Sequence, residues 1–542
     1  MLIDARRVAS GSGLHFDVCI IGAGPAGISL AQRLAVSGLR VVLVEGGGFT
    51  PRVRDQRMFA GTVTGSPYAD LQDVRFRVVG GSGSRWGGIC RPLDPIDFRA
   101  RDWVPDSGWP ISYDEVARYY PAAAEALGVS NSDFTRLSPG LTDATPDLGG
   151  TGFERIHYRS SPMVDYGHAV RDRLERSRDI TLLVNANVTR LLSTAVGDAV
   201  TGVDVRTFAG GAVAVTARTY VLAAGSVENA RLLLVSDDAG PAGLGNRHDV
   251  VGRYFMEHVH VDIATLLPSR RTTDWLSYRT NAPHQPVLVS ALSPSEEVQR
   301  DERIGSAAVT VAPSWYVTRR AFVGMHPRFT VPAERVYRGL SGTSERAAAA
   351  ALDVARAAWN LREGKSAWPR REPTRTIYYR GEQGPARENR VVLGDRRDLL
   401  GHPVADLRWQ VRDADLTGAS AVLGRFAAAA ATGGWGDVAV PDEDLRERIV
   451  GGPHHLGTTR MSRDPRTGVV DTDSRVHGVG NLYVAGGSVF PTGGHANPTL
   501  TVIALALRLG EHLVSRRMRD HLEVRPVTAG AGEVSTARSP RR

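Results

Sequence analysis

A stretch of about 30 residues near the N-terminus constrains the fold more than any other feature of the sequence. Residues 16–21 are a run of mostly apolar, strand-forming side chains, as expected for a strand buried on both faces. A Gly-x-Gly-x-x-Gly turn that starts at Gly22 follows, and residues 28–36 then have the apolar spacing of a helix. Residues 40–45 form a second apolar run that ends on Glu45. This order of strand, turn, helix and strand predicts a β-α-β unit that binds a dinucleotide.

Each glycine of the turn has its own predicted role. Gly22 permits the tight turn, Gly24 lets a pyrophosphate approach the backbone, and Gly27 allows the helix to pack closely on the strand. The anion would lie at the helix N-terminus, where free N–H groups and the helix dipole favour negative charge. Glu45 would accept hydrogen bonds from both ribose hydroxyls, which disfavours a 2′-phosphate. A glycine-rich turn without a ligand would leave Glu45 without this role.

A second glycine-rich segment, near the C-terminus, distinguishes between two classes of dinucleotide. Residues 481–485 form a short apolar strand, and residues 486–497 then lead to Pro498 and an apolar helix. Proline favours the first turn of a helix and Asn497 is a capping residue type, so we expect a helix N-terminus here. Such a terminus stabilises negative charge on the pyrimidine edge of a reduced flavin, which a nicotinamide dehydrogenase does not need. The sequence therefore favours FAD over NAD.

The composition excludes several other classes of protein. The 542 residues include two cysteines, Cys19 and Cys90, which rules out a disulfide framework and a cysteine-rich metal site. No spacing of His, Asp or Glu residues indicates a bound metal. Half of the formal net charge of +8 lies within residues 516–542, and no basic stripe rich in aromatic residues is present, so we expect no nucleic-acid partner. No apolar run approaches the roughly 18 residues of a membrane helix, and the N-terminus has no apolar signal core, so we expect no membrane association and a cytoplasmic location.

The rest of the chain alternates between strand and helix patterns. Strands are expected at residues 180–188, 200–209, 219–224, 390–393 and 404–411, and helices at residues 170–176, 228–235, 344–361 and 414–431. No internal repeat of about 20–50 residues is present, which argues against solenoids and propellers.

Further motifs carry a resemblance to a known family. They are residues 78–88 (VVGGSGSRWGG), 223–233 (AAGSVENARLL), 454–461 (HHLGTTRM), 470–476 (VDTDSRV) and 481–501. Together with the N-terminal unit, they make the chain resemble the glucose-methanol-choline (GMC) oxidoreductases, FAD enzymes that oxidise alcohols. The resemblance covers residues 16–128, 180–265 and 380–515, whereas residues 266–380 carry no recognisable motif.

The resemblance implies an α/β fold with two domains, of which the FAD-binding domain is discontinuous in the sequence. A Rossmann-like FAD-binding domain would be joined to a substrate domain built on an antiparallel β-sheet covered by helices. The FAD-binding domain would comprise residues 1–75, 180–262 and 450–517, with flavin-contacting and connecting segments at 76–179, a substrate-binding domain at 263–449 and a basic, disordered tail at 518–542.

Within the family, residues 454–461 and 493–501 (GGHANPTLT) are similar to the sugar-oxidising branch, which includes pyranose oxidases and glycoside 3-oxidases. That branch pairs a histidine with an asparagine, here His454 and Asn497. The implied reaction oxidises a secondary hydroxyl at C2 or C3 of a sugar or glycoside to a ketone, with O2 or another acceptor taking the electrons. Pyranose oxidases carry a flavin-linked histidine before the tryptophan of the glycine-rich loop. Here Arg85 precedes Trp86, so we expect FAD to be bound non-covalently.

The two paired residue types suit this chemistry. A neutral imidazole, which titrates near pH 6.5, can take the hydroxyl proton, and a carboxamide can donate to the oxygen without adding charge. We therefore predict His454 as the base and Asn497 as the donor that positions the hydroxyl, while the Asn497 carbonyl oxygen could also cap the helix. His455, the next residue, is the alternative base.

The same motifs predict the contacts with cofactor and substrate. The predicted cofactor-binding residues are Gly22, Gly24, Pro25, Ala26, Gly27, Glu45, Gly80, Gly81, Ser82, Trp86, Gly87, Gly88, Val188, Ala224, Gly225, Gly486, Ser488, Asn497, Pro498 and Thr499. The predicted substrate-contacting residues are Arg91, Glu382, Gln383, His454, His495 and Asn497. His495 is also a residue type that orients its neighbours in a loop.

Two other functions fit the sequence. One is FAD-dependent oxidation of a different alcohol, such as an aminoglycoside intermediate or a primary alcohol. The other is a flavin-binding protein without catalysis, which a measurement of turnover would separate from the enzyme.

Overall fold

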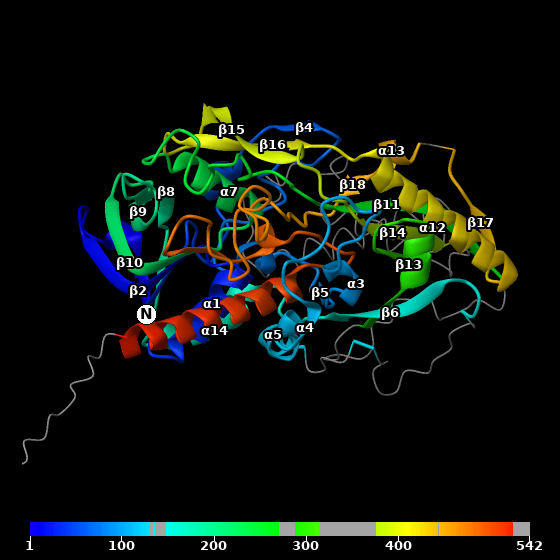
Figure 1. Ribbon diagram of the computed structural model, residues 1–542, viewed down its shortest axis with the longest axis horizontal. Helices are drawn as coiled ribbons and strands as arrows, with labels where there is room; N and C mark the ends of the chain where they lie inside the picture. Colours follow the sequence, from blue (N-terminus) through cyan, green and yellow to red (C-terminus); the bar gives the residue numbers. More distant parts are fainter. Residues whose placement is uncertain (130–133, 136–147, 270–287, 314–374, 443, 524–542) are drawn as a thin grey trace, which may run out of the picture.

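The computed structural model of the chain (Figure 1) describes residues 1–129, 134–135, 148–269, 288–313, 375–442 and 444–523. The helix expected at residues 344–361 lies outside these ranges. Within them, no helix is long and apolar enough to cross a lipid bilayer.

The first sheet is the one that the N-terminal motif predicts. Its strands in spatial order are β1 (Leu2–Asp4), β7 (Ile180–Val184), β3 (Val41–Val44), β2 (Gly13–Ile21), β10 (Ala212–Leu222), β9 (Val200–Arg206) and β8 (Asn187–Ser193), and β19 (Leu482–Val484) pairs with β10. Strands β1, β7, β3, β2 and β10 run parallel to one another, and β19 runs parallel to β10. Strand β9 is antiparallel to both of its neighbours, β10 and β8. The Rossmann-like part of the predicted fold class is confirmed.

The register of this sheet aligns the ends of its central strands. Ile21 pairs with both Val44 and Leu222, and Leu222 also pairs with Val484. Because parallel strands end at the same edge, the turns that follow these four residues lie side by side. Segments from both ends of the chain therefore meet at one edge of the sheet.

Two long helices lie together against this sheet. α1 (Pro25–Ala35) packs along α14 (Thr499–Glu523), as Figure 1 shows in blue and red. Both bury leucine and isoleucine side chains completely, including Ile28 of α1 and Ile503 of α14. Residues 518–523, which the sequence assigned to a disordered tail, are the last residues of α14.

The second sheet supplies the predicted antiparallel platform. Its order is β17 (Gly436–Ala439), β11 (His258–Pro268), β14 (Arg375–Glu382), β13 (Ala307–Pro313), β12 (Leu288–Pro294), β6 (Phe153–Ser160) and β5 (Ile89–Cys90), and β18 (Val450–Gly451) pairs with β11. The pairings are antiparallel, and α12 (Asp413–Thr432) packs against β14, β11 and β17. The expected boundary at residue 262 falls inside β11, and β6 comes from the expected connecting segment.

A small third sheet covers the outer side of α7 (Ser226–Val235). It contains β15 (Arg390–Arg397), β16 (Pro403–Trp409) and β4 (Val63–Gly65). The remaining elements are short: α2 (Val53–Gln56), α3 (Pro95–Phe98), α4 (Tyr113–Ala117), α5 (Tyr120–Ala126), α6 (Tyr166–Arg176), α8 (Glu296–Asp301), α13 (Leu445–Arg448), η1 (Ala5–Arg7), η2 (Arg57–Phe59), η3 (Gly81–Ser84) and η6 (Gly487–Val489). Both cysteines are unpaired thiols with no exposed surface.

Candidate active site

A cavity of about 750 Å³ lies at the edge where the parallel strands end. The sequence-predicted cofactor residues that line it are Gly22, Gly24, Pro25, Ala26, Glu45, Gly81, Ser82, Trp86, Gly87, Val188, Ala224, Gly225, Gly486, Asn497, Pro498 and Thr499. Gly27, Gly80, Gly88 and Ser488 do not belong to the described lining. The cavity therefore joins the N-terminal turn to the C-terminal segment, as the two motifs predict.

The three glycines of the N-terminal turn occupy physically different positions. Gly22 has a positive φ of 106°, which favours glycine. A Cβ on Gly27 would lie 2.0 Å from the Gly22 carbonyl oxygen, so Gly27 is required for helix packing. A Cβ on Gly24 would meet no protein atom within 4 Å, because this position faces the cavity. Gly24 is also the N-cap of α1, with no side-chain cap, so free backbone N–H groups lie there.

Glu45 lies behind this turn and also lines the cavity. Its two carboxylate oxygens accept backbone N–H bonds from Ala23 at 3.1 Å and from Gly47 at 2.8 Å. A carboxylate oxygen has more than one lone pair, so capacity remains for a ribose hydroxyl. The open helix terminus, the glycine facing the cavity and the fixed carboxylate together fit a dinucleotide such as FAD.

The glycine-rich loop of residues 78–88 closes over the start of α1. A Cβ on Gly83 would approach a Pro25 side-chain carbon to 2.7 Å, so this loop packs directly on the helix terminus. Arg85 and Trp86 both line the cavity, and the Trp86 indole N–H donates to the Met163 carbonyl at 2.9 Å.

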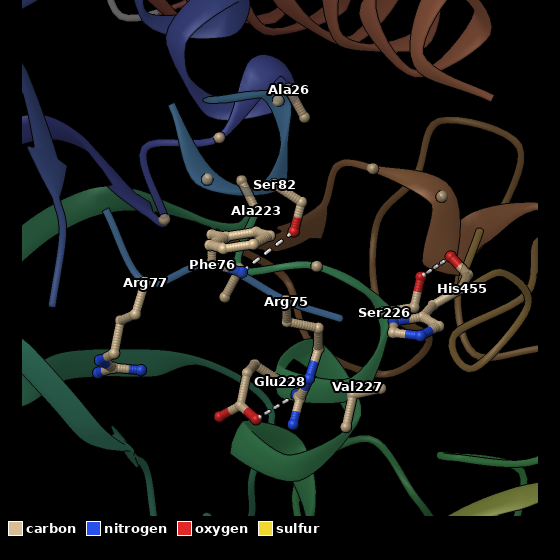
Figure 2. A pocket seen from close by; sticks show the side chains of 18 of the residues that line it. Ala26, Arg75, Phe76, Arg77, Ser82, Ala223, Ser226, Val227, Glu228 and His455 are labelled. Atoms are coloured by element: carbon tan, nitrogen blue, oxygen red, sulfur yellow. Dashed lines mark hydrogen bonds and ion pairs between the residues drawn. The ribbon is translucent and has the colours of Figure 1, made fainter. Parts of the chain in front are cut away.

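An ion pair that the sequence did not predict supports the floor of the cavity (Figure 2). Arg75 Nη1 donates to Glu228 Oε1 at 2.8 Å, and both side chains are almost fully buried. The Ser226 hydroxyl donates to the His455 carbonyl at 2.5 Å, as Figure 2 also shows. This contact connects the start of α7, which follows β10, to the segment that carries His454 and His455.

His454 and Asn497 meet at the side of the cavity next to the antiparallel sheet. Asn497 Nδ2 lies 3.2 Å from His454 Nε2, although 43 residues separate them in the chain. Asn497 Oδ1 accepts a hydrogen bond from Arg380 Nη1 at 2.7 Å. The predicted helix cap by this oxygen is not observed: among the described contacts it accepts from Arg380 and from no backbone N–H of α14, which begins at Thr499.

Two further histidines surround His454. His258 Nδ1 lies 2.8 Å from His454 Nδ1, and the neighbouring strand residue His260 has its ring centre 5.7 Å from that of His454. Ring nitrogens of these three histidines lie within 4.8 Å of one another, a metal-compatible cluster that no spacing in the sequence indicated. Sequence reasoning missed Arg380 and the functional position of His258 because they come from strands that converge only in the fold.

His454 and His258 are held neutral. Burial, together with His258, His260 and Arg380, lowers the pKa of His454 well below the usual 6.5. Burial lowers the pKa of His258 to about 3, with Arg380 as the next cause. A neutral imidazole at His454 is the protonation state that a base needs.

The alternative base, His455, also lines the cavity, but one of its ring nitrogens is already engaged. Its Nε2 lies 2.8 Å from the Tyr68 hydroxyl, which donates to Glu257 Oε1 at 2.5 Å. The other oxygen of Glu257 accepts the backbone N–H of His454 at 2.9 Å. Burial raises the pKa of Glu257 to about 7. This network fixes the backbone of the two adjacent histidines.

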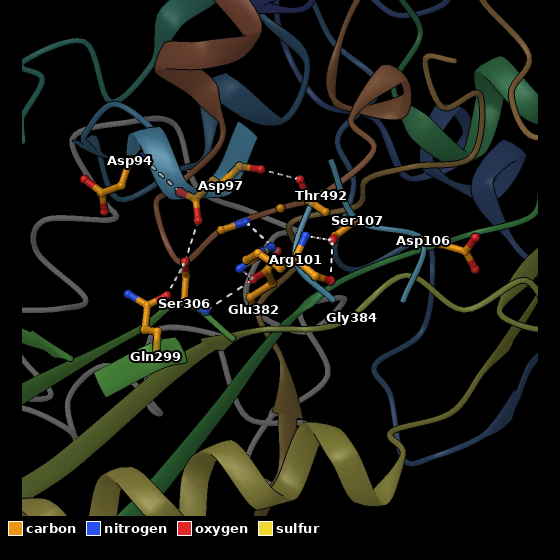
Figure 3. A network of polar contacts seen from close by, with 12 residues as sticks. Asp94, Asp97, Arg101, Asp106, Ser107, Gln299, Ser306, Glu382, Gly384 and Thr492 are labelled. Atoms are coloured by element: carbon orange, nitrogen blue, oxygen red, sulfur yellow. Dashed lines mark hydrogen bonds and ion pairs between the residues drawn. The ribbon is translucent and has the colours of Figure 1, made fainter. Parts of the chain in front are cut away.

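Four predicted substrate contacts do not belong to the described cavity lining: Arg91, Glu382, Gln383 and His495. Glu382 is instead paired with Arg101 (Figure 3), and Gln383 accepts the Trp409 indole N–H at 2.8 Å. Both ring nitrogens of His495 are engaged, by Tyr158 at 2.8 Å and by Asp94 at 3.1 Å, so it orients its neighbours. Arg91 pairs with Asp94.

Comparisons with known proteins agree with this geometry. A family model described as GMC oxidoreductase matches residues 385–506, and one described as FAD dependent oxidoreductase matches residues 17–243. The 2-methyl-1,2-propanediol dehydrogenase of Mycolicibacterium austroafricanum is 27% identical over an alignment of length 584 that covers 94% of this chain and 97% of the relative. The fructose dehydrogenase large subunit of Gluconobacter japonicus is 23% identical over an alignment of length 580 that covers 93% of this chain and 98% of the relative.

A solved structure has the same fold. It is a variant of the formate oxidase of Aspergillus oryzae RIB40, with a TM-score of 0.52 and 17% identity. The match covers 95% of this chain and 100% of that chain.

Proposed function

We propose that this chain, an FAD-dependent oxidoreductase of the GMC family acting on CH–OH groups, oxidises a secondary hydroxyl of a sugar or glycoside, at C2 or C3, to a ketone. The observation that carries the proposal is the 3.2 Å contact between His454 and Asn497 inside the cavity that the dinucleotide turn opens into. The name of the fructose dehydrogenase relative supports a sugar as the substrate class.

The residues that would hold FAD are those of the parallel-strand edge. The N-terminus of α1 would face the pyrophosphate, Glu45 the ribose, and the segment from Asn497 to Thr499 the flavin. Arg85 precedes Trp86 at the position of the flavin-linked histidine, so non-covalent binding is part of the proposal. FAD, when bound, supplies the acceptor for the hydride that leaves the alcohol carbon.

His454 and Asn497 would act on the hydroxyl itself. The Nε2 atom of His454 takes the hydroxyl proton, a role that contributes roughly 10²–10⁴-fold to a rate. The Asn497 NH2 group donates to the same oxygen as negative charge develops on it. Their mutual contact in the free enzyme would open to admit the hydroxyl oxygen between them.

A second candidate function is oxidation of a different alcohol, such as an aminoglycoside intermediate or a primary alcohol. The 2-methyl-1,2-propanediol dehydrogenase relative, which aligns over nearly the whole chain, favours it by its name. The electron acceptor in either case is O2 or another oxidant.

Anaerobic reduction of the purified yellow holoenzyme tests both candidates. The panel contains D-glucose, methyl β-D-glucopyranoside, a C-glucoside, paromamine, 1,2-propanediol and ethanol, and bleaching of the flavin absorbance is followed. Faster bleaching by a sugar or glycoside, with a keto-sugar product, is expected. Faster bleaching by paromamine or a simple alcohol would favour the second candidate, and admission of O2 with peroxide detection then identifies an oxidase.

A further inference from the structure

A continuous chain of polar contacts leads from the cavity lining at Arg380, Asn497 and His454 to His258 and Gly493 behind it. Arg380 Nη1 donates to Asn497 Oδ1 at 2.7 Å, and Asn497 Nδ2 lies 3.2 Å from His454 Nε2. On the other side of that ring, His454 Nδ1 lies 2.8 Å from His258 Nδ1. His258 Nε2 faces the Gly493 carbonyl oxygen at 3.5 Å. The two histidines thus sit between an arginine and a backbone carbonyl.

The arginine sets the direction of the hydrogen bonds from one end. A guanidinium can only donate, so Oδ1 is the acceptor and the Asn497 carboxamide must turn its NH2 group toward His454. An NH2 group also only donates. The Nε2 atom of His454 must therefore be the acceptor, without a proton of its own.

The backbone carbonyl sets the same direction from the other end. The Gly493 oxygen can only accept, so the proton of neutral His258 lies on Nε2. The Nδ1 atom of His258 is then the acceptor, and the proton of His454 must lie on its Nδ1. The opposite direction would set two N–H donors against each other at the His454–Asn497 contact and two lone pairs against each other at Gly493.

We propose that Arg380 and His258 are positioning residues that hold His454 in the tautomer whose Nε2 is unprotonated and faces the substrate hydroxyl. The inference deepens the proposed function and rests on it, because a base must accept the hydroxyl proton at Nε2. Arg380 acts through Asn497, and His258 acts through the far nitrogen of the base. The low pKa of both histidines supports the assignment, since each neutral ring carries a single proton.

The tautomer can be measured without any substrate. Holoenzyme labelled with ¹⁵N-histidine is observed by long-range ¹H–¹⁵N NMR, and the His454 signals are those that disappear in the His454→Gln variant. The expected spectrum has the His454 proton on Nδ1 and an unprotonated Nε2. A proton on Nε2 of His454 in the wild-type holoenzyme would overturn the proposal.

A matched pair of substitutions tests His258. His258→Asn keeps an oxygen acceptor near the former Nδ1 position, whereas His258→Leu has none. We expect Nε2 protonation of His454 to appear in the leucine variant and not in the asparagine variant. His260→Leu, two residues along β11, removes an imidazole beside the chain of contacts and should leave the His454 tautomer unchanged. An unchanged tautomer in His258→Leu would refute the role of His258.

A second pair tests Arg380 from the other end. Arg380→Lys keeps a donor for Asn497 Oδ1, and Arg380→Met removes it. With methyl β-D-glucopyranoside as substrate, we expect kcat to fall by about tenfold or more in Arg380→Met and His258→Leu, with little change in KM. The fall is a fraction of the rate enhancement that a correctly protonated base provides. The lysine and asparagine variants should recover most of that loss. Equal losses within each pair, at normal FAD content, would overturn the proposal.

The outcomes separate this inference from the proposed function. If no compound of the substrate panel reduces the flavin, the proposed function fails, and the NMR measurement still decides the tautomer by itself. If the glycoside is oxidised and the wild-type His454 carries its proton on Nε2, only the positioning role fails.

Discussion

Arg101 and Glu382 form a fully buried, two-pronged ion pair, with Nη1–Oε2 and Nη2–Oε1 distances of 2.8 Å each. They are 281 residues apart in the chain, and each side chain has 1% of its surface exposed. Glu382 Oε1 also accepts the Gly494 N–H at 3.3 Å. The pair therefore joins the segment after α3 to β14 and to the loop that leads to Asn497 (Figure 3).

Removal of one partner of this pair should strongly destabilise the protein. Arg101→Met leaves an unpaired carboxylate in the interior, which costs about 3–5 kcal/mol of unfolding free energy. Urea unfolding of the holoenzyme measures the loss. Arg303→Met is the control, because Arg303 and Asp102 form an exposed pair whose removal should change the unfolding free energy by less than about 1 kcal/mol. Equal effects of the two substitutions would contradict the prediction.

Two alanine substitutions in the dinucleotide turn should separate folding from cofactor binding. In Gly24→Ala the new methyl group enters the cavity and meets no protein atom, so the apo-protein should keep its stability and lose FAD affinity. In Gly27→Ala the methyl group would lie 2.0 Å from the Gly22 oxygen, so the protein itself should be destabilised. Thermal unfolding of apo-protein and FAD titration measure the two effects. Full FAD affinity in Gly24→Ala would show that the cofactor does not approach this backbone.

His454→Gln should abolish most turnover without releasing the flavin. A glutamine cannot take the hydroxyl proton, so kcat is expected to fall by about 10²–10⁴-fold. The flavin absorbance of the purified variant and its rate with the best substrate of the panel are measured. His477→Gln serves as the control, because His477 bonds the Ser462 carbonyl at 2.9 Å outside the cavity. Wild-type turnover in His454→Gln would exclude His454 as the base.

The rate should stay constant through the pH range where an ordinary histidine titrates. His454 has its pKa lowered well below 6.5 by burial and by the neighbouring His258, His260 and Arg380, so it remains unprotonated as the pH falls through 6.5. The acid limb of kcat/KM should therefore appear well below pH 6.5. Arg380→Met removes one positive charge and should move this limb toward higher pH. A wild-type limb centred at pH 6.5 would contradict the assignment of the base or the burial of its ring.

Asp97 should make the protein less stable as the pH rises from about 4 to about 7. Burial, with the nearby carboxylates of Asp94 and Glu382, raises the Asp97 pKa from 3.8 to about 7, against the opposing effect of Arg101. In this range the folded protein binds more protons at Asp97 than the unfolded chain does, so its contribution to stability is lost as the pH rises. Asp97→Asn should flatten this part of the pH dependence. Urea unfolding at pH 5 and pH 8 measures the unfolding free energy of both proteins. An equal change in unfolding free energy between these pH values in the wild type and in Asp97→Asn would refute the prediction.

The side chains at the end of β14 make contacts that the sequence did not predict. Residues 382 and 383 were predicted as substrate contacts, yet Glu382 pairs with Arg101 and Gln383 bonds to Trp409. Arg380, which was not predicted, lines the cavity instead. Arg380 and Glu382 are two residues apart on β14 and therefore share one face of the strand. Their partners, Asn497 for Arg380 and Arg101 for Glu382, come from distant parts of the chain, so only the fold decides which of the two side chains reaches the cavity.

By itself, the sequence determined the β-α-β unit, its open helix terminus and the alternation of strand and helix patterns, because these depend on residues close to one another in the chain. The resemblance added the pairing of His454 with Asn497. The tertiary structure alone decided which groups surround that pair: His258 and Arg380 lie 196 residues from His454 and 117 residues from Asn497, respectively. Hydrogen bonds depend on distance in space, so the direction of proton donation at the base became defined only when β11, β14 and the C-terminal loop were brought together.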